Sequence, residues 1–325
     1  MKAVFTLNPF AAAGGGSHSF ARVLAEGLPA HGITVSFDVE RAADVVLVFA
    51  QHGSERLLAR HRAWGARILH RLDERIDPGE GKVRREKHER IARLNARADL
   101  TIFQSEFVRG NVGPMCRAPQ ARVIHNGVDL RVFSPEGPRI VLDGAPVALH
   151  VSWSVGESKR LDRIGELLAA GPPGLRVYCA GRHAESGRTW LGDPRVTLLG
   201  PRPRDAVAAL MRSADFLFFP SELEPCPNTP LEAMASGLPI LYHPSGGTPE
   251  LLGDAAVAMT GSLSEDIARL LGEAGEWRAR ALARAPRFSA EHATTQYATV
   301  MTEAAATRAA DPPARTRRLW TRRGY

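Results

Sequence analysis

The sequence has few cysteines and no long apolar run, and each shortage excludes a class of protein. Its three cysteines, Cys116, Cys179 and Cys226, form no C-x-x-C pair among 325 residues. This argues against a disulfide framework or a zinc site and favours a reducing cytoplasm. The longest apolar run, 45–50, is far shorter than the roughly 20 residues that span a bilayer. The N-terminus does not resemble a signal peptide.

Positive charge is in excess, but it is unevenly distributed. The net charge is +7, and the stretch 308–325 carries six arginines against Asp311, so the rest of the chain has a net charge of only +2. We expect this tail to be disordered. A second basic cluster, 82–97, has seven Lys and Arg against two glutamates on a helical pattern.

A solvated helix face is the simpler interpretation of 82–97. The alternatives are a weak peripheral contact with an anionic membrane surface, or a phosphate-rich substrate. The sequence contains no recognisable RNA- or DNA-binding module, so we expect no nucleic-acid partner. The oligomeric state is left open.

Strand-like runs alternate with helical patterns along the chain, which predicts βαβ units and parallel sheets. A Pro- and Gly-rich stretch, 134–146, separates two similar halves. We therefore expect an α/β protein with two Rossmann-like, doubly wound domains, 1–136 and 137–290, that face a cleft. Helix 291–307 is expected to pack back on the first domain. The expected helices are 17–32, 54–63, 82–97, 159–169, 204–213, 230–236 and a long helical region, 264–307.

The stretch PSELEPCPNTPLEAMASGLP, 220–239, places Glu224 and Glu232 eight residues apart. The prolines between them exclude a shared helix face. A helix can begin at Pro230, with Thr229 as its N-cap and Glu232 as its third residue, which is a capping box. Capping alone would explain Glu232, but not the stiff loop in front of it. A helix N-terminus suits a diphosphate, and carboxylates accept hydrogen bonds from sugar hydroxyls, so a sugar nucleotide fits this pattern.

This stretch, followed by GGTPELLGDA, resembles the donor site of the retaining family 4 glycosyltransferases of the GT-B fold. Further matches follow in the expected order: GGGSHSFARVLAEGLPAHGITV, ADLTIFQSEFVRGNV, VIHNGVDLRVFSP, HVSWSVGESKRLDRI and VTLLGPRPRDAVAALMRSADFLFFPS. The resemblance implies transfer of a sugar from a nucleoside-diphosphate sugar to a hydroxyl acceptor, with retention of configuration. The acceptor would be a small molecule, a glycan or a lipid-linked sugar. No cofactor is expected beside this co-substrate, and the lack of a D-x-D motif predicts no metal.

The resemblance also implies roles for individual residues. Glu232 would hold the ribose hydroxyls, Glu224 would lie near the donor sugar, and Lys159 would pair with the diphosphate. Lys159 is one of only four lysines beside 38 arginines, although a solvated lysine at a helix start is the alternative. The catalytic candidates are Glu224, Lys159 and Asp73. The donor-binding candidates are Gly15, Gly16, Ser154, Lys159, Arg160, Leu199, Glu224, Asn228, Thr229, Pro230 and Glu232.

The sequence departs from the family pattern just before Lys159. The family usually has Gly-Arg where this chain has Trp153 and Ser154, and Arg160 is a candidate substitute. This departure leaves open a non-catalytic nucleotide-sugar-binding partner, and the fold leaves open a sugar-nucleotide epimerase or a phosphorylase. In the first half, the acceptor-side candidates are His70, Arg71 and His52, although a lone histidine more often has a structural role.

Overall fold

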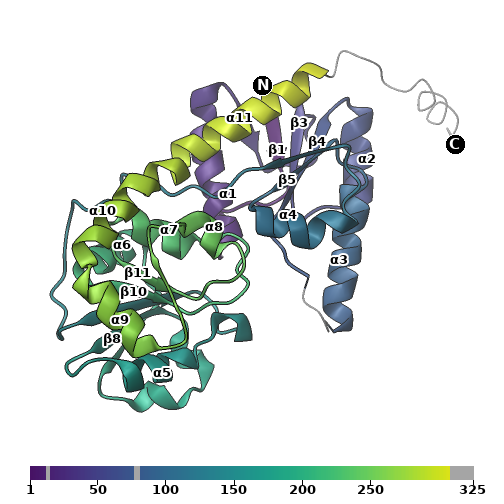
Figure 1. The fold of residues 1–325 in the computed structure, drawn as a ribbon. Coiled ribbons are helices and arrows are strands. Elements are labelled where there is room, and N and C mark those ends of the chain that lie inside the picture. Colours follow the sequence, from purple (N-terminus) through teal and green to yellow (C-terminus); the bar gives the residue numbers. More distant parts are fainter. Residues whose placement is uncertain (12–14, 77–80, 308–325) are drawn as a thin grey trace, which may run out of the picture. The chain divides into compact units, whose positions relative to one another are not determined.

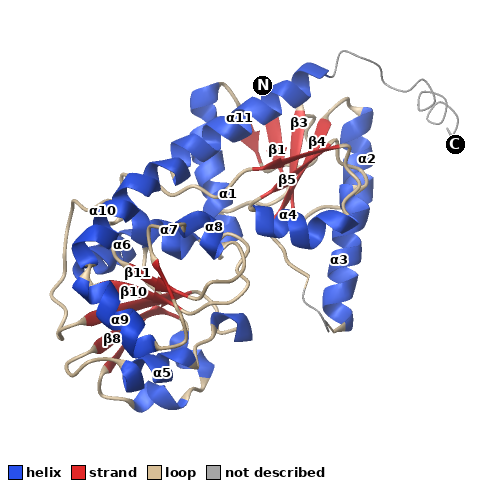
Figure 2. Ribbon diagram, in the orientation of Figure 1, coloured by secondary structure: helices blue, strands red, loops and turns tan. Residues whose placement is uncertain are grey.

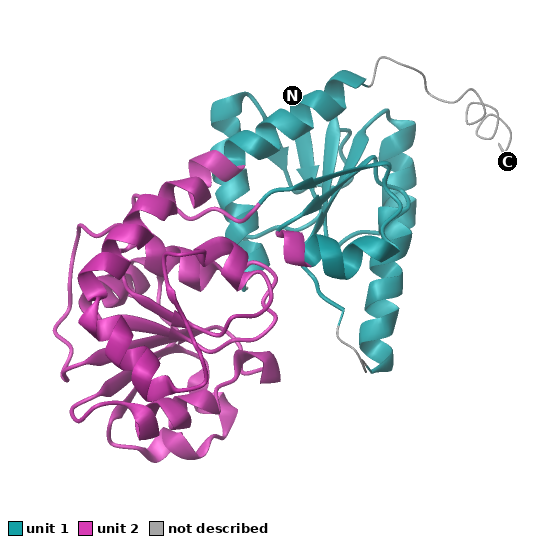
Figure 3. Cartoon of the chain, viewed as in Figure 1, with its two compact units in different colours: residues 1–104, 108–124, 294–325 teal, residues 105–107, 125–293 magenta. Residues whose placement is uncertain are grey.

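The computed structural model describes residues 1–11, 15–76 and 81–307, and the chain divides into two compact units (Figure 3). Unit 1 consists of 1–104, 108–124 and 294–325, and unit 2 of 105–107 and 125–293. The boundary therefore falls between residues 124 and 125, whereas the sequence placed it between 136 and 137. The tail 308–325, expected to be disordered, lies outside the described residues.

Unit 1 is built around a parallel sheet with the strand order β2-β1-β3-β4-β5-β6 (Figure 1). Helices α4 and α11 carry residues of both units. The strands are β1 (Lys2–Phe5), β2 (Thr34–Ser36), β3 (Val45–Phe49), β4 (Arg67–Leu72), β5 (Leu100–Phe103) and β6 (Gln120–Val123); the helices are α1 (Gly16–Gly27), α2 (Glu55–Ala63), α3 (Lys82–Asn95), α4 (Glu106–Val112) and α11 (Ala290–Ala306).

Helices cover both faces of this sheet, so the central strands are apolar on both sides. All five residues of β3 are buried. Leu58 of α2 and Leu94 of α3 pack in one cluster with β-strand valines on one face. On the other face α11 packs against α1, where the rings of Phe20 and Tyr297 have centroids 5.7 Å apart. The expectation that the C-terminal helix returns to the first unit is thus confirmed.

Unit 2 contains a second parallel sheet with the order β12-β11-β10-β7-β8-β9. Helices and strands alternate along this part of the chain, and helices flank the strands (Figure 2). The strands are β7 (Val147–Ser152), β8 (Arg176–Gly181), β9 (Val196–Gly200), β10 (Phe216–Phe219), β11 (Ile240–Tyr242) and β12 (Val257–Ala258); the helices are α5 (Arg163–Ala170), α6 (Arg204–Ser213), α7 (Asn228–Ala235), α8 (Thr248–Leu252), α9 (Leu263–Gly272) and α10 (Ala274–Arg284).

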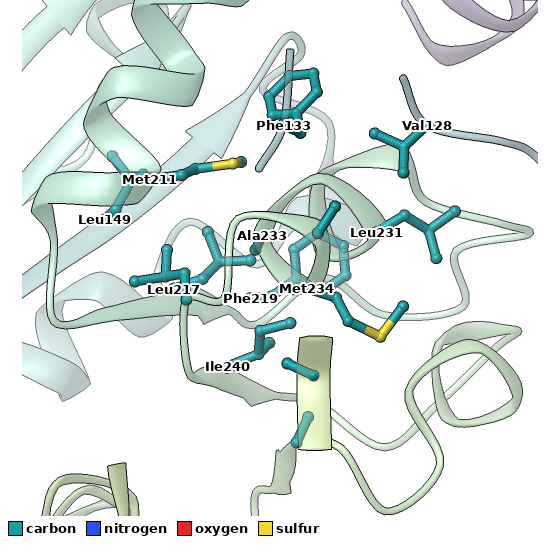
Figure 4. Packing of buried hydrophobic residues seen from close by; sticks show 14 of the residues in the cluster. Val128, Phe133, Leu149, Met211, Leu217, Phe219, Leu231, Ala233, Met234 and Ile240 are labelled. Atoms are coloured by element: carbon teal, nitrogen blue, oxygen red, sulfur yellow. The ribbon is translucent and has the colours of Figure 1, made fainter. Parts of the chain in front are cut away.

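Alternation along the strands divides the core of unit 2 into two clusters, one on each face of the sheet. Leu217 and Phe219 of β10 pack in one cluster with side chains of α6 and α7 (Figure 4). Side chains of α8 belong to the same cluster. Phe216 and Phe218 point into the other cluster, with side chains of α5 and α9. Both units are therefore doubly wound α/β sheets, as the sequence predicted.

Several expected helix bounds differ from those observed. The helix expected at 230–236 begins two residues earlier, and the long region 264–307 is divided into α9, α10, a 3₁₀ turn and α11. The short elements α4, α8 and β12 were not expected, because elements of seven residues or fewer give too weak a periodic signal. The segment expected as helix 159–169 starts with a 3₁₀ turn, η3 (Glu157–Lys159), before α5.

The basic cluster 82–97 contains the whole of α3, and several of its cations already have acidic partners. Lys87 pairs with Glu74 at 2.6 Å, and Arg97 pairs with Glu55 at 3.1 Å. These pairs fit the solvated-face interpretation, and membrane contact through this helix stays a prediction. Among the described residues, no helix has the length and apolar character needed to cross a membrane.

Candidate functional site

The strand order of unit 2 places a topological switch point between β7 and β10, because connections run outward in opposite directions from these two neighbours. Loops that leave the carboxyl ends of such strands form the ligand crevice of open α/β sheets. In this unit they are the loop after β7, residues 153–162, and the loop after β10, residues 220–227. We call them the β7 loop and the β10 loop.

The two loops are joined by ion pairs and a backbone hydrogen bond. Lys159 Nζ donates to Glu224 Oε1 at 2.6 Å, and Arg160 pairs with Glu222. The amide of Glu222 donates to the carbonyl of Ser158 at 2.7 Å. Two predicted site residues, Lys159 and Glu224, are thus brought into direct contact although 65 residues separate them in the chain.

A third segment, Ser245–Gly247, packs against the β10 loop and contacts Leu223 and Glu224. Leu223 has a left-handed backbone with φ 54°, and its amide donates to Ser245 Oγ at 2.9 Å. Gly246 has φ 66°, and a Cβ there would lie 2.6 Å from the carbonyl oxygen of Glu224. The amide of Gly247 donates to that same carbonyl at 2.8 Å. Only glycine allows this close backbone approach, so these residues fix the position of Glu224.

The capping box predicted for α7 is wrong. The helix begins at Asn228 with Pro227 as its N-cap, so Thr229 is the second helical residue and Glu232 the fifth. Pro230 is accommodated as the third residue, because the N–H groups of the first helical turn have no partner within the helix.

A residue outside the predicted site, Asn126, anchors the start of α7. Its Nδ2 donates to the carbonyl of Cys226 at 3.0 Å and to Asn228 Oδ1 at 2.9 Å. The side chain of Asn228 is therefore held in place by the segment His125–Gly127. The sequence signal was the HNG triplet, which the resemblance matched without implying a role.

Glu232 lies in the first part of α7, and its carboxylate makes no hydrogen bond or ion pair with any described residue. Burial raises the pKa of its carboxyl group to about 7, and Arg204 opposes this rise only in part. The carboxylate is partly exposed and has no hydrogen-bond partner among the described residues, so it is available to a ligand that supplies hydroxyl donors.

The remaining donor-binding candidates differ in their surroundings. Arg160 has φ 46° and binds Asp162 as well as Glu222, so both sides of its guanidinium are engaged. The carbonyl of Ser154 accepts a hydrogen bond from the Ser152 hydroxyl. Trp153 is 44% exposed and brings no charge to the end of β7. Leu199 lies in the edge strand β9, which is separated from β7 by β8.

Unit 1 has a cavity of about 150 Å³ at the carboxyl ends of β1, β3 and β4. This is again a switch point, since β1 and β3 are neighbours from which the strand order runs in opposite directions. The cavity brings together predicted residues from three loops, namely Gly15, Gly16, His52 and Asp73. Its described lining is Gly15, Gly16, Ser17, His18, Phe49, Ala50, Gln51, His52, Asp73 and Glu74.

Asp73 is oriented by buried partners. Its Oδ2 accepts from Arg71 at 2.7 Å and from the Ser17 hydroxyl, and its side chain is only 7% exposed. Burial alone would raise the pKa of Asp73, but the Arg71 guanidinium and these hydrogen bonds lower it, so the group is ionised. Arg71 is fully buried, with Gln104 as a second partner and the Phe20 ring 4.8 Å away.

The structure places two acceptor-side candidates beneath the cavity surface, which corrects the sequence interpretation. His70 is 0% exposed, and its Nε2 is 2.8 Å from the carbonyl of Ala50. Burial lowers the pKa of His70 to about 4, so the ring is neutral and structural. Arg71 is fully buried and donates to Asp73, which lines the cavity. His52 lines the cavity, and burial lowers its pKa as well.

Comparison with known proteins tests the resemblance seen in the sequence. Residues 160–274 match the family model for glycosyl transferases group 1. The resemblance to group 1 glycosyltransferases is thereby confirmed. D-inositol 3-phosphate glycosyltransferase of Mycolicibacterium smegmatis is 32% identical over 216 residues, which cover 60% of this chain and 49% of that protein. The chain thus spans about half the length of the curated relatives it matches.

Solved structures show the fold. Sucrose-phosphate synthase from Thermosynechococcus elongatus matches with a TM-score of 0.76 at 19% identity, over 94% of this chain and 99% of that one. HepE of Anabaena in complex with UDP-glucose matches with a TM-score of 0.72 at 18% identity, over 93% and 100%. The fold is that of the GT-B glycosyltransferases.

Among the described residues, no group of three or more His, Cys, Asp or Glu side chains is arranged to hold a metal ion. Cys116, Cys179 and Cys226 form no disulfide bond in the described part of the chain. Of these, Cys226 lies in the β10 loop and its carbonyl is bound by Asn126.

Proposed function

We propose that this protein transfers a sugar from a nucleoside-diphosphate sugar to a hydroxyl acceptor, with retention of configuration and without a metal ion. The observation that carries the proposal is the arrangement in unit 2 of Lys159, Glu224 and the unpartnered Glu232 around the start of α7. The group 1 match, 160–274, covers Glu224, Glu232 and α7 and begins directly after Lys159.

Each of these groups meets one part of a nucleotide sugar. The Lys159 ammonium and the N-terminus of α7 stabilise negative charge on the diphosphate as the sugar departs. Glu232 accepts hydrogen bonds from ribose hydroxyls, and Glu224 accepts them from the donor sugar. Arg160 is held by two carboxylates, Asp162 and Glu222, whereas Lys159 is held by Glu224 alone, so Lys159 is the principal cation offered by the β7 loop.

Donor binding then involves an exchange of partners at Lys159. Without ligand, the ammonium is neutralised by Glu224 at 2.6 Å. The diphosphate supplies a new anion for Lys159, and Glu224 is released toward the hydroxyls of the donor sugar. The acceptor's proton passes to the departing phosphate, since Glu224 is committed to the sugar and Glu232 to the ribose.

The first donor to test is UDP-glucose, because HepE was solved in complex with it and shares the fold. UDP-, GDP-, ADP- and dTDP-glucose are added separately to the purified protein, and the midpoint of thermal unfolding is measured. A ligand that binds only the folded state raises this midpoint. We expect a rise with at least one of the four. No rise with any of them would contradict the donor site.

Two variants and a matched control locate the effect. Lys159→Met and Glu232→Gln each remove one proposed contact. We expect each to lower the affinity for the nucleotide sugar that binds by about tenfold to a hundredfold, which is the usual contribution of a charge-assisted hydrogen bond. Lys82→Met makes the same change at a solvent-exposed lysine of α3 and should leave affinity unchanged. Wild-type affinity and transfer rate in Lys159→Met would refute its role.

A further inference from the structure

His243 follows β11 directly and is connected by hydrogen bonds to the loop that carries Glu224. Its amide donates to the carbonyl of Phe219 at 3.0 Å, which fixes its backbone beside the end of β10. Its ring nitrogen Nδ1 is 2.9 Å from Ser245 Oγ. The same Oγ accepts the amide of Leu223 at 2.9 Å, one residue before Glu224. The imidazole, the hydroxyl and this amide therefore form a chain of hydrogen bonds that ends at the β10 loop.

The hydrogens available to these groups give the chain one direction. A serine hydroxyl has one hydrogen to donate and two lone pairs that accept. Because Ser245 Oγ accepts from Leu223, its own hydrogen is available to His243 Nδ1, which then carries no hydrogen. The other ring nitrogen, Nε2, lies 3.6 Å from Glu222 Oε1, so its hydrogen faces a carboxylate. Both neighbours favour the same neutral tautomer, with Nδ1 as the acceptor and Nε2–H as the donor.

The surroundings of the ring keep it neutral at neutral pH. His243 is partly buried, and burial lowers the pKa of its imidazole. Glu222 opposes this shift, whereas Arg163 and Arg160 lower the pKa further. Glu222 is itself paired with Arg160, so its negative charge is partly compensated. The neutral imidazole is therefore the form that accepts from Ser245.

The orientation of the Ser245 hydroxyl matters because Leu223 has an unfavourable backbone conformation. Its φ of 54° is in the left-handed region, which a leucine adopts only where its neighbours hold it there. A hydroxyl whose hydrogen points to His243 presents its lone pairs to the Leu223 amide. A hydroxyl turned the other way would present its hydrogen to that amide instead. The conformation of Leu223 in turn sets the direction in which Glu224 leaves the loop toward Lys159.

We propose that His243 is a positioning residue of the donor site. It acts through the Ser245 hydroxyl, which holds Leu223 in its left-handed conformation and so keeps Glu224 directed at the donor sugar. The inference rests on the proposed function for the identity of this sugar as the ligand of Glu224. His243 touches no substrate group in this assignment. Its loss therefore removes the contribution of the sugar to the affinity and spares the contacts that the nucleotide makes elsewhere in unit 2.

Hydrogen exchange tests the chain of hydrogen bonds without any ligand. Amide exchange of the β10 loop is measured by mass spectrometry in the full chain and in His243→Ala, His243→Asn and His243→Gln. The polar end of asparagine is as many bonds from Cα as Nδ1 of histidine, and that of glutamine as many as Nε2. We expect exchange about tenfold faster in the alanine and glutamine variants and close to wild type in the asparagine variant.

Any other ranking of the three variants overturns the proposal. Slow exchange with glutamine and fast exchange with asparagine would assign the role of His243 to its contact with Glu222. Wild-type exchange in all three variants would show that the β10 loop does not depend on the ring.

Calorimetry then separates the sugar from the nucleotide. UDP and UDP-glucose are each titrated into the wild type and His243→Ala; where the thermal screen selects another base, the corresponding diphosphate and its glucose conjugate replace this pair. We expect the variant to bind UDP within about twofold of the wild type and UDP-glucose about fivefold to tenfold more weakly. Equal losses for the two ligands, or no loss for either, overturn the positioning role. His292→Ala, at an exposed histidine of α11, is the matched control.

A double-mutant cycle shows whether His243 and Ser245 act through one hydrogen bond. Ser245→Ala alone should weaken UDP-glucose binding at least as much as His243→Ala, because it removes the group that contacts Leu223. Once this hydroxyl is absent, His243→Ala should cause almost no further loss. Two losses that multiply in the double variant contradict a role of His243 through Ser245.

The outcome is separable from that of the proposed function. A protein that shows the expected ranking in hydrogen exchange but binds no nucleotide sugar retains the chain of hydrogen bonds and loses the proposed transfer. A protein that binds UDP-glucose equally well as wild type and as His243→Ala retains the proposed transfer and loses the positioning role.

Discussion

Glu232 shows how a single, partly buried group can make ligand affinity depend on pH. Its pKa of about 7 in the unliganded protein means that the carboxylate gains a proton as the pH falls through neutrality. Ribose hydroxyls are best held by the ionised form, which accepts several hydrogen bonds. We therefore expect the dissociation constant for UDP to rise by about fivefold when the pH is lowered from about 7 to about 6, measured by calorimetry.

The control for this dependence is Glu232→Gln, which cannot titrate. Its affinity for UDP should be weaker than that of the wild type and nearly flat over the same interval. Glutamine keeps the length and shape of the side chain, so a difference between the two slopes reports on the proton at this residue. Equal slopes in both proteins would assign the pH dependence to another group, such as the nucleotide itself.

At the scale of the element, the β10 loop owes its shape to a neighbour that sequence periodicity cannot reveal. Strands and helices of unit 2 followed from their patterns, and α6 (Arg204–Ser213) was predicted with its observed bounds. The start of α7 was placed wrongly, because Pro230 is also compatible with the third helical position. The fit of Gly246 beneath Glu224 is a tertiary contact between residues 22 apart, so no local rule predicts it.

Gly246→Ala tests this support. The new Cβ would lie 2.6 Å and 2.7 Å from backbone atoms of Glu224, and φ 66° is itself unfavourable for alanine. We expect the free energy of unfolding to fall by about 1–3 kcal/mol and the stabilisation by UDP-glucose to be lost, because the β10 loop must move. Both are measured by thermal unfolding with and without the nucleotide sugar.

Gly272→Ala is the matched control for that substitution. It lies at the exposed end of α9, and no atom lies within 4 Å of a Cβ built there. Alanine at this position should leave stability and the nucleotide response almost unchanged. If Gly246→Ala behaves in the same way, the β10 loop does not depend on close approach at Gly246.

At the scale of the whole molecule, the sequence predicted two doubly wound units, but it placed His70 and Arg71 in a ligand site although both are buried in the interior. His70 belongs to the apolar pattern that predicts β4, and from the sequence alone it could lie either at the carboxyl end of this strand or within the sheet. The parallel sheet of unit 1 is covered on both faces, so this position became interior. The same holds for Arg71, whose charge is compensated by Asp73 two residues later.

Buried histidines in both units give the whole chain a pH-dependent stability. Burial lowers the pKa of His70 in unit 1 and of His183 in unit 2 to about 4, from 6.5 in the unfolded chain. Burial and the neighbouring His183 lower the pKa of His150 further, and its Nδ1 lies 2.7 Å from His183 Nε2. The unfolded chain therefore binds more protons than the folded one between about pH 6.5 and 4, and stability is lost as the pH falls through this window.

The lowered pKa of one such histidine corresponds to about 3 kcal/mol of lost stability at the acidic end of the window. The raised pKa of Glu232 offsets the contribution of about one histidine, because the folded state holds the Glu232 proton more tightly than the unfolded state does. Urea unfolding at a series of pH values should show the net loss. His70→Gln keeps a donor near the Ala50 carbonyl and removes one titrating group, so its stability should fall less steeply between pH 6.5 and 4 than that of the wild type. The same substitution at exposed His31 is the control, and an equal slope in His70→Gln and wild type would show that His70 does not titrate on unfolding.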